Sequence, residues 1–232
     1  MAYGVLIAGR SGSGKSSSIR TLPPNQTCII NVDMKPLPIK GASSLYLAKK
    51  EEDCTKEELS LGKVVKTNDC ATILNVLQKI NTLPRFKYVI IDTITHMITG
   101  KFMKDIAVRG FDKYTNLANE VYLVIQQMLA MRDDMIIFLM AHTEYFTDDK
   151  GSVTWKMKTI GKLLDEKIVP ESYFSIVLEA TATQTEDKQA IYQFITNDPN
   201  TPAKSPLGMF EDKYIPNDLL LVTDRIKEYE QL

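Results

Sequence analysis

The residues with the clearest chemical potential form a short glycine-rich loop near the start of the chain. The stretch GRSGSGKSSS, residues 9–18, follows the apolar run VLIA and holds three glycines and one lysine within its first seven residues. Glycines allow backbone N–H groups to turn inward and to approach phosphate oxygens closely. A loop so poor in side chains, with one cation at its end, is suited to binding a triphosphate.

The spacing of this loop fits the pattern GxxxxGK[ST], the Walker A motif, between a buried strand and a helix. Lys15 is expected to reach the β- and γ-phosphates, the Ser16 hydroxyl to ligate Mg²⁺, and the helix N-terminus to add partial positive charge. A glycine-rich turn with an incidental lysine is the alternative, which the strand–loop–helix context disfavours. The predicted ligands are ATP and Mg²⁺. The predicted nucleotide-binding residues are Gly9, Arg10, Ser11, Gly12, Ser13, Gly14, Lys15, Ser16 and Ser17.

A second candidate is the acid that ends YVIID, residues 88–92. At the carboxyl edge of a parallel strand, Asp92 would point into the crevice where ligands bind. Four apolar residues followed by Asp resemble a Walker B strand, in which Asp92 holds Mg²⁺ through a water. The alternative is a cap for the following helix. Many AAA+ ATPases place a water-activating Glu at the next position, which is Thr93 here, so the pattern does not resemble that branch.

Two further polar residues follow buried strands. Asp33 ends TCIINVD, residues 27–33, where RecA-like ATPases carry the carboxylate that orients the attacking water. Asp is one methylene shorter than Glu and reaches less far; stabilising the MKP turn is its alternative role. His142 follows MIIFLMA, residues 135–141, and could donate a hydrogen bond to the γ-phosphate and sense its state. A structural histidine is the alternative.

The elements that must position these residues alternate between strand and helix, the pattern of a parallel α/β sheet. Apolar runs predict strands over residues 5–8, 27–33, 88–92 and 135–141. Helical periodicity predicts helices from about Lys15 to the prolines at 23 and 24, over 73–80 with Asn68 or Asp69 as the cap, over 93–109 and over 117–129. Later segments, 172–184 and 189–198, predict an antiparallel hairpin added to the sheet, and 217–229 predicts a closing helix.

Composition sets few further limits. The chain has 232 residues, of which 44% are hydrophobic and 25% charged, and a net charge of −1 that gives no push toward nucleic acid or membrane. Cys28, Cys54 and Cys70 show no CxxC spacing, which argues against a disulfide framework or a zinc site and for a reducing compartment. Without a long apolar run or a basic leader, we expect no membrane span and no signal peptide, and so a soluble cytoplasmic protein.

The combined segments resemble one family. GRSGSGKSSSIRTLP, INVDMKPLPIKGA, YVIIDTITHM, IFLMAHTEY and the late KSPLGMF with IPNDL are similar to phage-encoded RecA-core ATPases of the Sak type, over about residues 5–229. The resemblance implies a RecA-like P-loop NTPase core, mostly a parallel sheet flanked by helices with a C-terminal antiparallel hairpin, as one domain over residues 1–232. It also implies Mg-ATP, a homo-oligomeric ring or filament, single-stranded DNA and, as a further candidate partner, a single-strand-binding protein in the host cytoplasm. Asp33 departs from the Glu of RecA, and the chain is too short for RecA's extra terminal domains.

By the same resemblance, the polar segment 143–167 would correspond to the mobile DNA-contacting loop of a RecA core. An aromatic residue interleaved with cations suits a single-stranded backbone and base stacking. An ordinary solvated loop, with Trp155 packed on the domain, is the alternative. The predicted DNA-binding residues are Trp155, Lys156, Lys158 and Lys162.

Lys204 lies beyond the predicted hairpin. In RecA-type assemblies, lysines after the last long strand reach across the interface to the neighbour's γ-phosphate, and Lys204 is the candidate for this role. A solvated loop lysine is the alternative.

The predicted function is a DNA-stimulated RecA-like ATPase that acts on single-stranded DNA in phage recombination or annealing. A nucleotide-switched binding or loading module with little hydrolysis remains open, because Asp33 replaces Glu. A small P-loop kinase is the third candidate, but such kinases usually need a lid with several arginines. Between Asp92 and Arg225 the chain carries only Arg109 and Arg132, which counts against a kinase.

Overall fold

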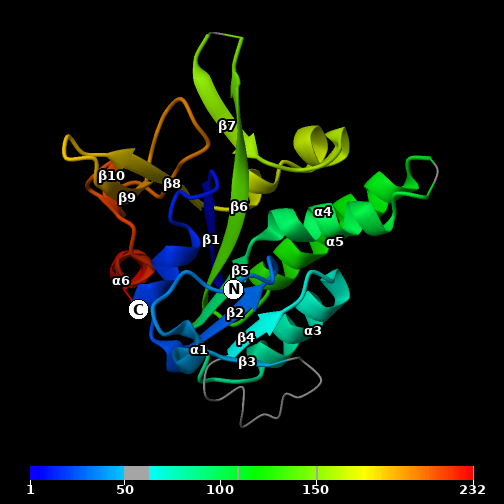
Figure 1. The fold of residues 1–232 in the computed structure, drawn as a ribbon, viewed down its shortest axis with the longest axis horizontal. Helices are drawn as coiled ribbons and strands as arrows, with labels where there is room; N and C mark the ends of the chain where they lie inside the picture. The colour runs from blue at the N-terminus through cyan, green and yellow to red at the C-terminus, as the bar shows by residue number, and fades with distance from the viewer. Residues whose placement is uncertain (50–62, 109, 150, 232) are drawn as a thin grey trace.

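The structure is a computed structural model that describes residues 1–49, 63–108, 110–149 and 151–231. The strands within these residues are β1 (Tyr3–Gly9), β2 (Thr27–Asn31), β3 (Leu47–Lys49), β4 (Lys63–Lys66), β5 (Tyr88–Asp92), β6 (Ile136–Thr147), β7 (Val153–Met157), β8 (Ile176–Gln184), β9 (Ala190–Ile195) and β10 (Tyr214–Pro216). They form one sheet in the order β10-β9-β8-β1-β6-β5-β2-β4-β3, with β7 paired to β6 (Figure 1).

The α-helices of the described residues confirm four of the predicted helical segments. These elements are α1 (Ala42–Leu45), α3 (Cys70–Asn81), α4 (Ile94–Lys104), α5 (Asp112–Leu129) and α6 (Leu219–Glu230), with 3₁₀-helices η1 (Ser16–Thr21), η2 (Pro24–Gln26) and η5 (Pro170–Tyr173) and the π-helix η4 (Leu163–Ile168). The predicted cap of α3 is confirmed, because the Asp69 side chain accepts from the Thr72 N–H at 3.0 Å. The helix predicted over 93–109 ends at Lys104, and Arg109 lies outside the described residues.

The central strands are parallel, as predicted. Pairs β1–β6, β1–β8, β5–β6, β2–β5, β2–β4 and β3–β4 all run parallel, whereas β8–β9 and β9–β10 are antiparallel. This arrangement confirms an α/β fold with a mostly parallel sheet and a C-terminal antiparallel hairpin. Because parallel strands end at the same edge, Gly9 and Asp92 lie at one edge of the sheet, and Gly9 is paired in register with His142.

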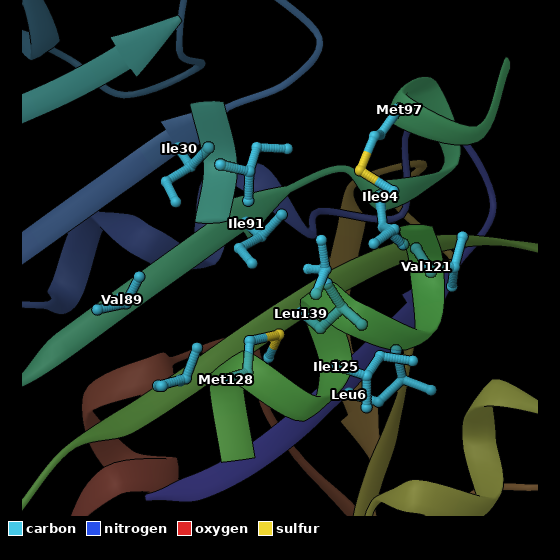
Figure 2. Close-up of a cluster of buried hydrophobic side chains, with 14 of the residues drawn as sticks. Leu6, Ile30, Val89, Ile91, Ile94, Met97, Val121, Ile125, Met128 and Leu139 are labelled. Carbon is cyan, nitrogen blue, oxygen red and sulfur yellow. The ribbon is translucent and has the colours of Figure 1, made fainter. Parts of the chain in front are cut away.

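Side chains along each strand alternate between two helical layers. Leu6 of β1 faces the layer of α3, α4 and α5, while Val5 and Ile7 face the layer that contains Ile19 of η1 and the apolar side of α6. Figure 2 shows the first of these clusters, where sheet residues such as Leu139 lie against Ile125 and its neighbours from α5. Helices cover the central strands on both faces, so these strands are almost continuous apolar runs. Their polar side chains therefore lie at the strand ends, where they can reach solvent.

One prediction of local structure is wrong. The segment after residue 141 was expected to be a polar loop, but β6 continues to Thr147 and pairs with β7 as an antiparallel arm that projects past the sheet (Figure 1). Tyr145 lies opposite Trp155, and the buried Trp155 and Met157 share one face of β7. Apolar side chains at every second position therefore bury one face of this segment, which forms a strand although its polar composition suggested a loop. We call residues 143–157 the β6–β7 arm.

Cys28 and Cys70 are buried, and Cys54 lies outside the described residues. In the described parts of the chain, no helix has the length and apolar character needed to cross a lipid bilayer.

Candidate nucleotide site

One crevice of about 360 Å³ at the carboxyl edge of the sheet brings together four of the five predicted catalytic residues: Lys15, Asp33, Asp92 and His142. They come from four segments of the chain. The segments are the glycine-rich loop after β1 and the residues that end or follow β2, β5 and the buried part of β6. Its lining includes Ser11, Gly12, Gly14, Lys15, Ser16, Ser17, Asp33, Asp92, Thr93, His142 and Tyr192.

The glycines of the loop are required by its backbone and by its neighbours. Gly12 and Gly14 have φ angles of 79° and 90°, which L-residues with a side chain rarely adopt. A Cβ at Gly9 would lie 2.5 Å from the Ala180 carbonyl oxygen of β8, and one at Gly14 would lie 2.8 Å from Cδ1 of Tyr192. The loop thus packs so closely on β8 and β9 that only glycine fits.

Lys15 is the cation of the loop, and it is 5% exposed. Its Nζ donates to the carbonyl oxygens of Gly9 and Arg10, both at 2.8 Å, and lies 3.4 Å from Nδ1 of His142. Burial lowers the pKa of Lys15 to about 8, although the nearby carboxylates of Asp92 and Asp33 oppose the shift. The ammonium therefore stays charged at neutral pH, and its hydrogen-bond acceptors are neutral carbonyls. A phosphate would be a stronger acceptor for Lys15, because its negative charge would assist the hydrogen bond.

Asp92 is 3% exposed, and its Oδ1 has no hydrogen-bond partner among the described residues. Burial raises the pKa of Asp92 to about 6, against which a hydrogen bond with Ser16 acts. A buried carboxylate oxygen without a partner is costly and calls for an ion or other ligand. Mg²⁺ prefers oxygen ligands, and Ser16 and Asp92 supply a hydroxyl and a carboxylate oxygen, so both residues fit the predicted magnesium site.

Asp33 faces the same crevice with 16% of its side chain exposed. Its Oδ1 accepts from the backbone N–H of Thr93 at 3.1 Å and from the Thr93 hydroxyl at 2.8 Å. Oδ2 lies 3.7 Å from Nζ of Lys35. The following turn is instead held by Asn31, whose amide donates to the Lys35 carbonyl at 2.7 Å. The carboxylate of Asp33 is therefore oriented by Thr93 toward the crevice, where a water-orienting group would have to lie.

His142 lies between the loop and α4. Its backbone N–H donates to the Thr95 hydroxyl at 2.9 Å, and its ring lies 5.8 Å, centroid to centroid, from that of His96. Burial and the charge of Lys15 lower the pKa of His142, which favours the neutral ring at neutral pH. A neutral imidazole beside Lys15 can donate one hydrogen bond to a phosphate oxygen.

Two loop residues point elsewhere. The guanidinium of Arg10 lies 4.1 Å from the centroid of the Tyr145 ring, so this side chain contacts the β6–β7 arm rather than the crevice. Ser13 is 5% exposed, and its Oγ has no hydrogen-bond partner in the described parts of the chain. Neither side chain lines the crevice, and the Ser13 N–H already donates to the Arg10 carbonyl at 3.2 Å, so the phosphate contacts expected of both residues stay predictions. The helix after the loop, η1, has six residues and is 3₁₀, so its dipole is weaker than the predicted helix implied.

The expected DNA-binding residues divide into buried and exposed ones. Trp155 is 1% exposed, and its Nε1 donates to Oε2 of Glu179 at 2.7 Å, so stacking on a base does not fit this structure. The alternative, in which it packs on the protein, is the one observed. Nζ of Lys156 lies 2.6 Å from Oδ2 of Asp165, whereas Lys158 and Lys162 are exposed.

Lys204 does not line the nucleotide crevice. Its backbone N–H and carbonyl are bonded to Val177 at 2.9 and 2.8 Å, and its exposed side chain lies at a separate cavity of about 730 Å³. The role of Lys204 at a neighbouring subunit's phosphate stays a prediction.

Sequence reasoning missed one residue that lines the crevice, Tyr192, and two that contact its lining, Asn217 and His96. Tyr192 of β9 packs against Gly14 and is 45% exposed, and Asn217 is buried near the same glycine with its Nδ2 unpartnered in the described structure. His96, on the first turn of α4, has its Nε2 3.6 Å from Oδ1 of Asp33. Both Tyr192 and Asn217 come from the last quarter of the chain. Asn217 lies in the IPNDL segment that carries the family resemblance, but only the fold places it and Tyr192 beside Gly14.

A family model described as an AAA domain matches residues 1–207, which include the whole lining of the crevice but not the neighbouring Asn217. No protein in the curated set matches the chain. Thr93 after Asp92 therefore does not separate this chain from every family that bears the AAA description.

Proposed function

The chain belongs to the AAA domain family, and we propose that it is a RecA-like Mg-ATPase that acts on single-stranded DNA in phage recombination or annealing. Nucleotide binding and hydrolysis are the general activities of such P-loop families. The DNA substrate, the phage setting, the host cytoplasm, the ring or filament and a single-strand-binding protein as partner are our proposals, and they rest on the resemblance of the sequence motifs.

The main observation in favour of nucleotide binding is that two buried charged residues, Lys15 and Asp92, lie together at the glycine-rich loop. Lys15 is held by neutral carbonyls, and Asp92 keeps one oxygen without a partner, although both side chains are at most 5% exposed. Both states cost stability, because neutral carbonyls compensate a buried ammonium only in part and a buried carboxylate oxygen without a hydrogen-bond donor is unsatisfied. A phosphate for Lys15 and a divalent cation for Asp92 would satisfy both groups at once.

The residues then take distinct roles in hydrolysis. Lys15 exchanges its carbonyl contacts for phosphate oxygens, and the loop backbone binds the same group. Ser16 and Asp92 would hold Mg²⁺, which when bound supplies charge neutralisation at the β- and γ-phosphates. Asp33, oriented by Thr93, positions the attacking water, and His142 donates to the γ-phosphate. Tyr192, beside Gly14, offers a ring against which the nucleobase can stack.

The DNA part of the proposal uses the exposed cations beyond the crevice. Lys158 and Lys162 follow the β6–β7 arm and are exposed, while Lys156 is engaged by Asp165. Backbone phosphates bind such cations with release of counterions. Lys204 is the proposed group that reaches the γ-phosphate of a neighbouring subunit in the assembly.

One experiment tests the function as a whole. ATP turnover is measured with and without single-stranded DNA, and particle size is measured with a non-hydrolysable ATP analogue. DNA-stimulated turnover and analogue-dependent assembly support the proposal. ATP binding without turnover would instead support a nucleotide-switched module, for which the shorter side chain of Asp33 in place of Glu is the argument.

A mixing experiment tests Lys204. Lys204→Ala and Lys15→Ala subunits are assembled together, and activity should partly return where an intact loop meets an intact lysine. Co-assembled particles that stay as inactive as the two separate variants would refute a role across the interface.

A further inference from the structure

Both histidines of the chain lie at the same carboxylate. His96 on α4 and His142 on β6 are 46 positions apart, yet each offers a ring nitrogen within 4.8 Å of an Asp33 oxygen and of the other histidine. The two rings meet edge to face with centroids 5.8 Å apart. We propose that Asp33, His96 and His142 form a binding site for a transition-metal ion, separate from the magnesium site of Ser16 and Asp92.

The donor set defines the class of ion. Two imidazoles and one carboxylate are the ligands of Zn²⁺, Mn²⁺, Fe²⁺ and Co²⁺, whereas Mg²⁺ prefers oxygen ligands alone. Ser16 and Asp92 supply only oxygens, so the two sites differ in chemistry although they share one crevice. Three protein ligands leave coordination positions open to water or to a phosphate oxygen.

The spacing of the ligands needs only local adjustment. Nε2 of His96 is 3.6 Å from Oδ1 of Asp33. Ligand atoms at about 2.0–2.2 Å from a tetrahedral ion lie roughly 3.3–3.6 Å from one another, so this pair is already at bridging distance. His142 must approach by a rotation of its ring. All three side chains are partly exposed, which leaves room for that rotation and a path for the ion.

The surroundings hold the ligands in place. Thr93 donates twice to Asp33 Oδ1, at 3.1 and 2.8 Å, which fixes the carboxylate in the manner of the outer partners of known metal sites. The bond from the His142 backbone to the Thr95 hydroxyl, 2.9 Å long, joins β6 to α4 next to His96. The backbone of His142 is thus tied to Thr95, the residue before His96, which keeps the two histidines close to each other.

Two cations compete with the ion. Lys15 Nζ is 3.4 Å from Nδ1 of His142, and Lys35 Nζ is 3.7 Å from Oδ2 of Asp33. Lys35 has 67% of its side chain exposed and can move away freely. Lys15 would leave His142 when it binds phosphate, so phosphate should strengthen metal binding.

The test uses the whole chain, freed of metal by a chelator and without nucleotide. Co²⁺ is added and its visible absorption followed, with Zn²⁺ as the competitor. One Co²⁺ per chain should bind, excess Mg²⁺ should not displace it, and His96→Asn and His142→Asn should each weaken binding at least ~10-fold. The exposed Asp212→Asn is the control carboxylate and should bind as the parent does. No bound Co²⁺, binding that survives both histidine variants, or displacement by Mg²⁺ would overturn the site.

A second measurement needs no variant. Because the chain has two histidines, its imidazole NMR signals report only on this cluster. One equivalent of Zn²⁺ should shift both ring signals together, and a shift of one or neither would overturn the proposal. ATP binding is not part of either readout, so failure here leaves the proposed function standing, and failure of ATP turnover leaves the metal site standing.

Discussion

Asp92 in the nucleotide crevice and Glu179 beneath the β6–β7 arm are both buried acids, 3% and 6% exposed, with opposite surroundings. Asp92 keeps one oxygen without a partner. Glu179 accepts from the Tyr145 hydroxyl at Oε1 and from Trp155 Nε1 at Oε2, so each of its oxygens has a donor. Both acids are buried, but the fold supplies a donor to each oxygen of Glu179 and leaves one oxygen of Asp92 without a partner among the described residues.

That difference separates a binding site from a structural network. A satisfied buried acid contributes to the stability of its region, whereas an unsatisfied one costs stability that only a ligand can return. We therefore expect changes at the crevice to affect activity most, and changes under the arm to affect stability most. Four predictions test this contrast, from the largest expected effect to the smallest.

Lys15→Ala should lower Mg-ATP hydrolysis by at least ~100-fold, because the charge-assisted contact with the phosphates is lost. Steady-state phosphate release measures the effect. Lys40→Ala, an exposed lysine outside the crevice, is the matched control. Turnover close to that of the control would remove the loop from the catalytic site.

Glu179→Ala should lower the free energy of unfolding by about 3 kcal/mol, because the buried Trp155 N–H and the half-buried Tyr145 hydroxyl lose their acceptor at about 1–3 kcal/mol each. Denaturant titration measures it, with the exposed Glu186→Ala as the control. Glu179→Gln keeps one acceptor oxygen and should lose less. A loss no greater than that of the control would mean that the network adds nothing to stability.

Asp92→Asn should have the opposite sign, raising the free energy of unfolding of the nucleotide-free protein by about 2–3 kcal/mol at neutral pH. The pKa is 3.8 in the reference state and about 6 in the fold, so the parent loses stability as pH rises through that window. The uncharged amide avoids that loss. The advantage should therefore vanish below about pH 4. Denaturant titrations at both pH values decide, and a destabilised variant at neutral pH would contradict the contrast.

Lys158→Ala together with Lys162→Ala should reduce the salt dependence of single-stranded DNA binding by a log–log slope of about 1.4, since each lost phosphate contact removes about 0.7. Fluorescence anisotropy at several salt concentrations measures the slope. Lys156→Ala, whose ammonium already pairs with Asp165, is the control and should change the slope less. An unchanged slope in the double variant would remove this region from the DNA path.

Much of the crevice edge of the sheet could be predicted from the sequence because its signals are local. The glycine spacing before Lys15, the apolar run that ends at Asp92 and the cap at Asp69 each depend on a few neighbouring residues. Parallel order then follows, because strands buried on both faces read as continuous apolar runs. Nothing local, in contrast, places His96 against Asp33 or Tyr192 against Gly14, since each pair depends on how distant elements pack.

The β6–β7 arm was missed for a different reason. Its composition is polar, and we weighed the lysines of 156, 158 and 162 above the alternation of Val153, Trp155 and Met157. That period of two was present in the sequence and predicts a strand with one buried face. For this segment, the spacing of the apolar residues predicts the secondary structure, whereas the number of lysines does not.

Trp155 has a further use that follows from its place in the Glu179 network. It is the only tryptophan in the chain, it is almost fully buried, and Arg10 of the glycine-rich loop stacks on Tyr145, its cross-strand neighbour. Indole emission depends on the polarity around the ring, so the tryptophan fluorescence of this protein, excited apart from its tyrosines, comes from one known position. The chain thus carries an optical probe of the arm, without any label, one side chain away from the glycine-rich loop.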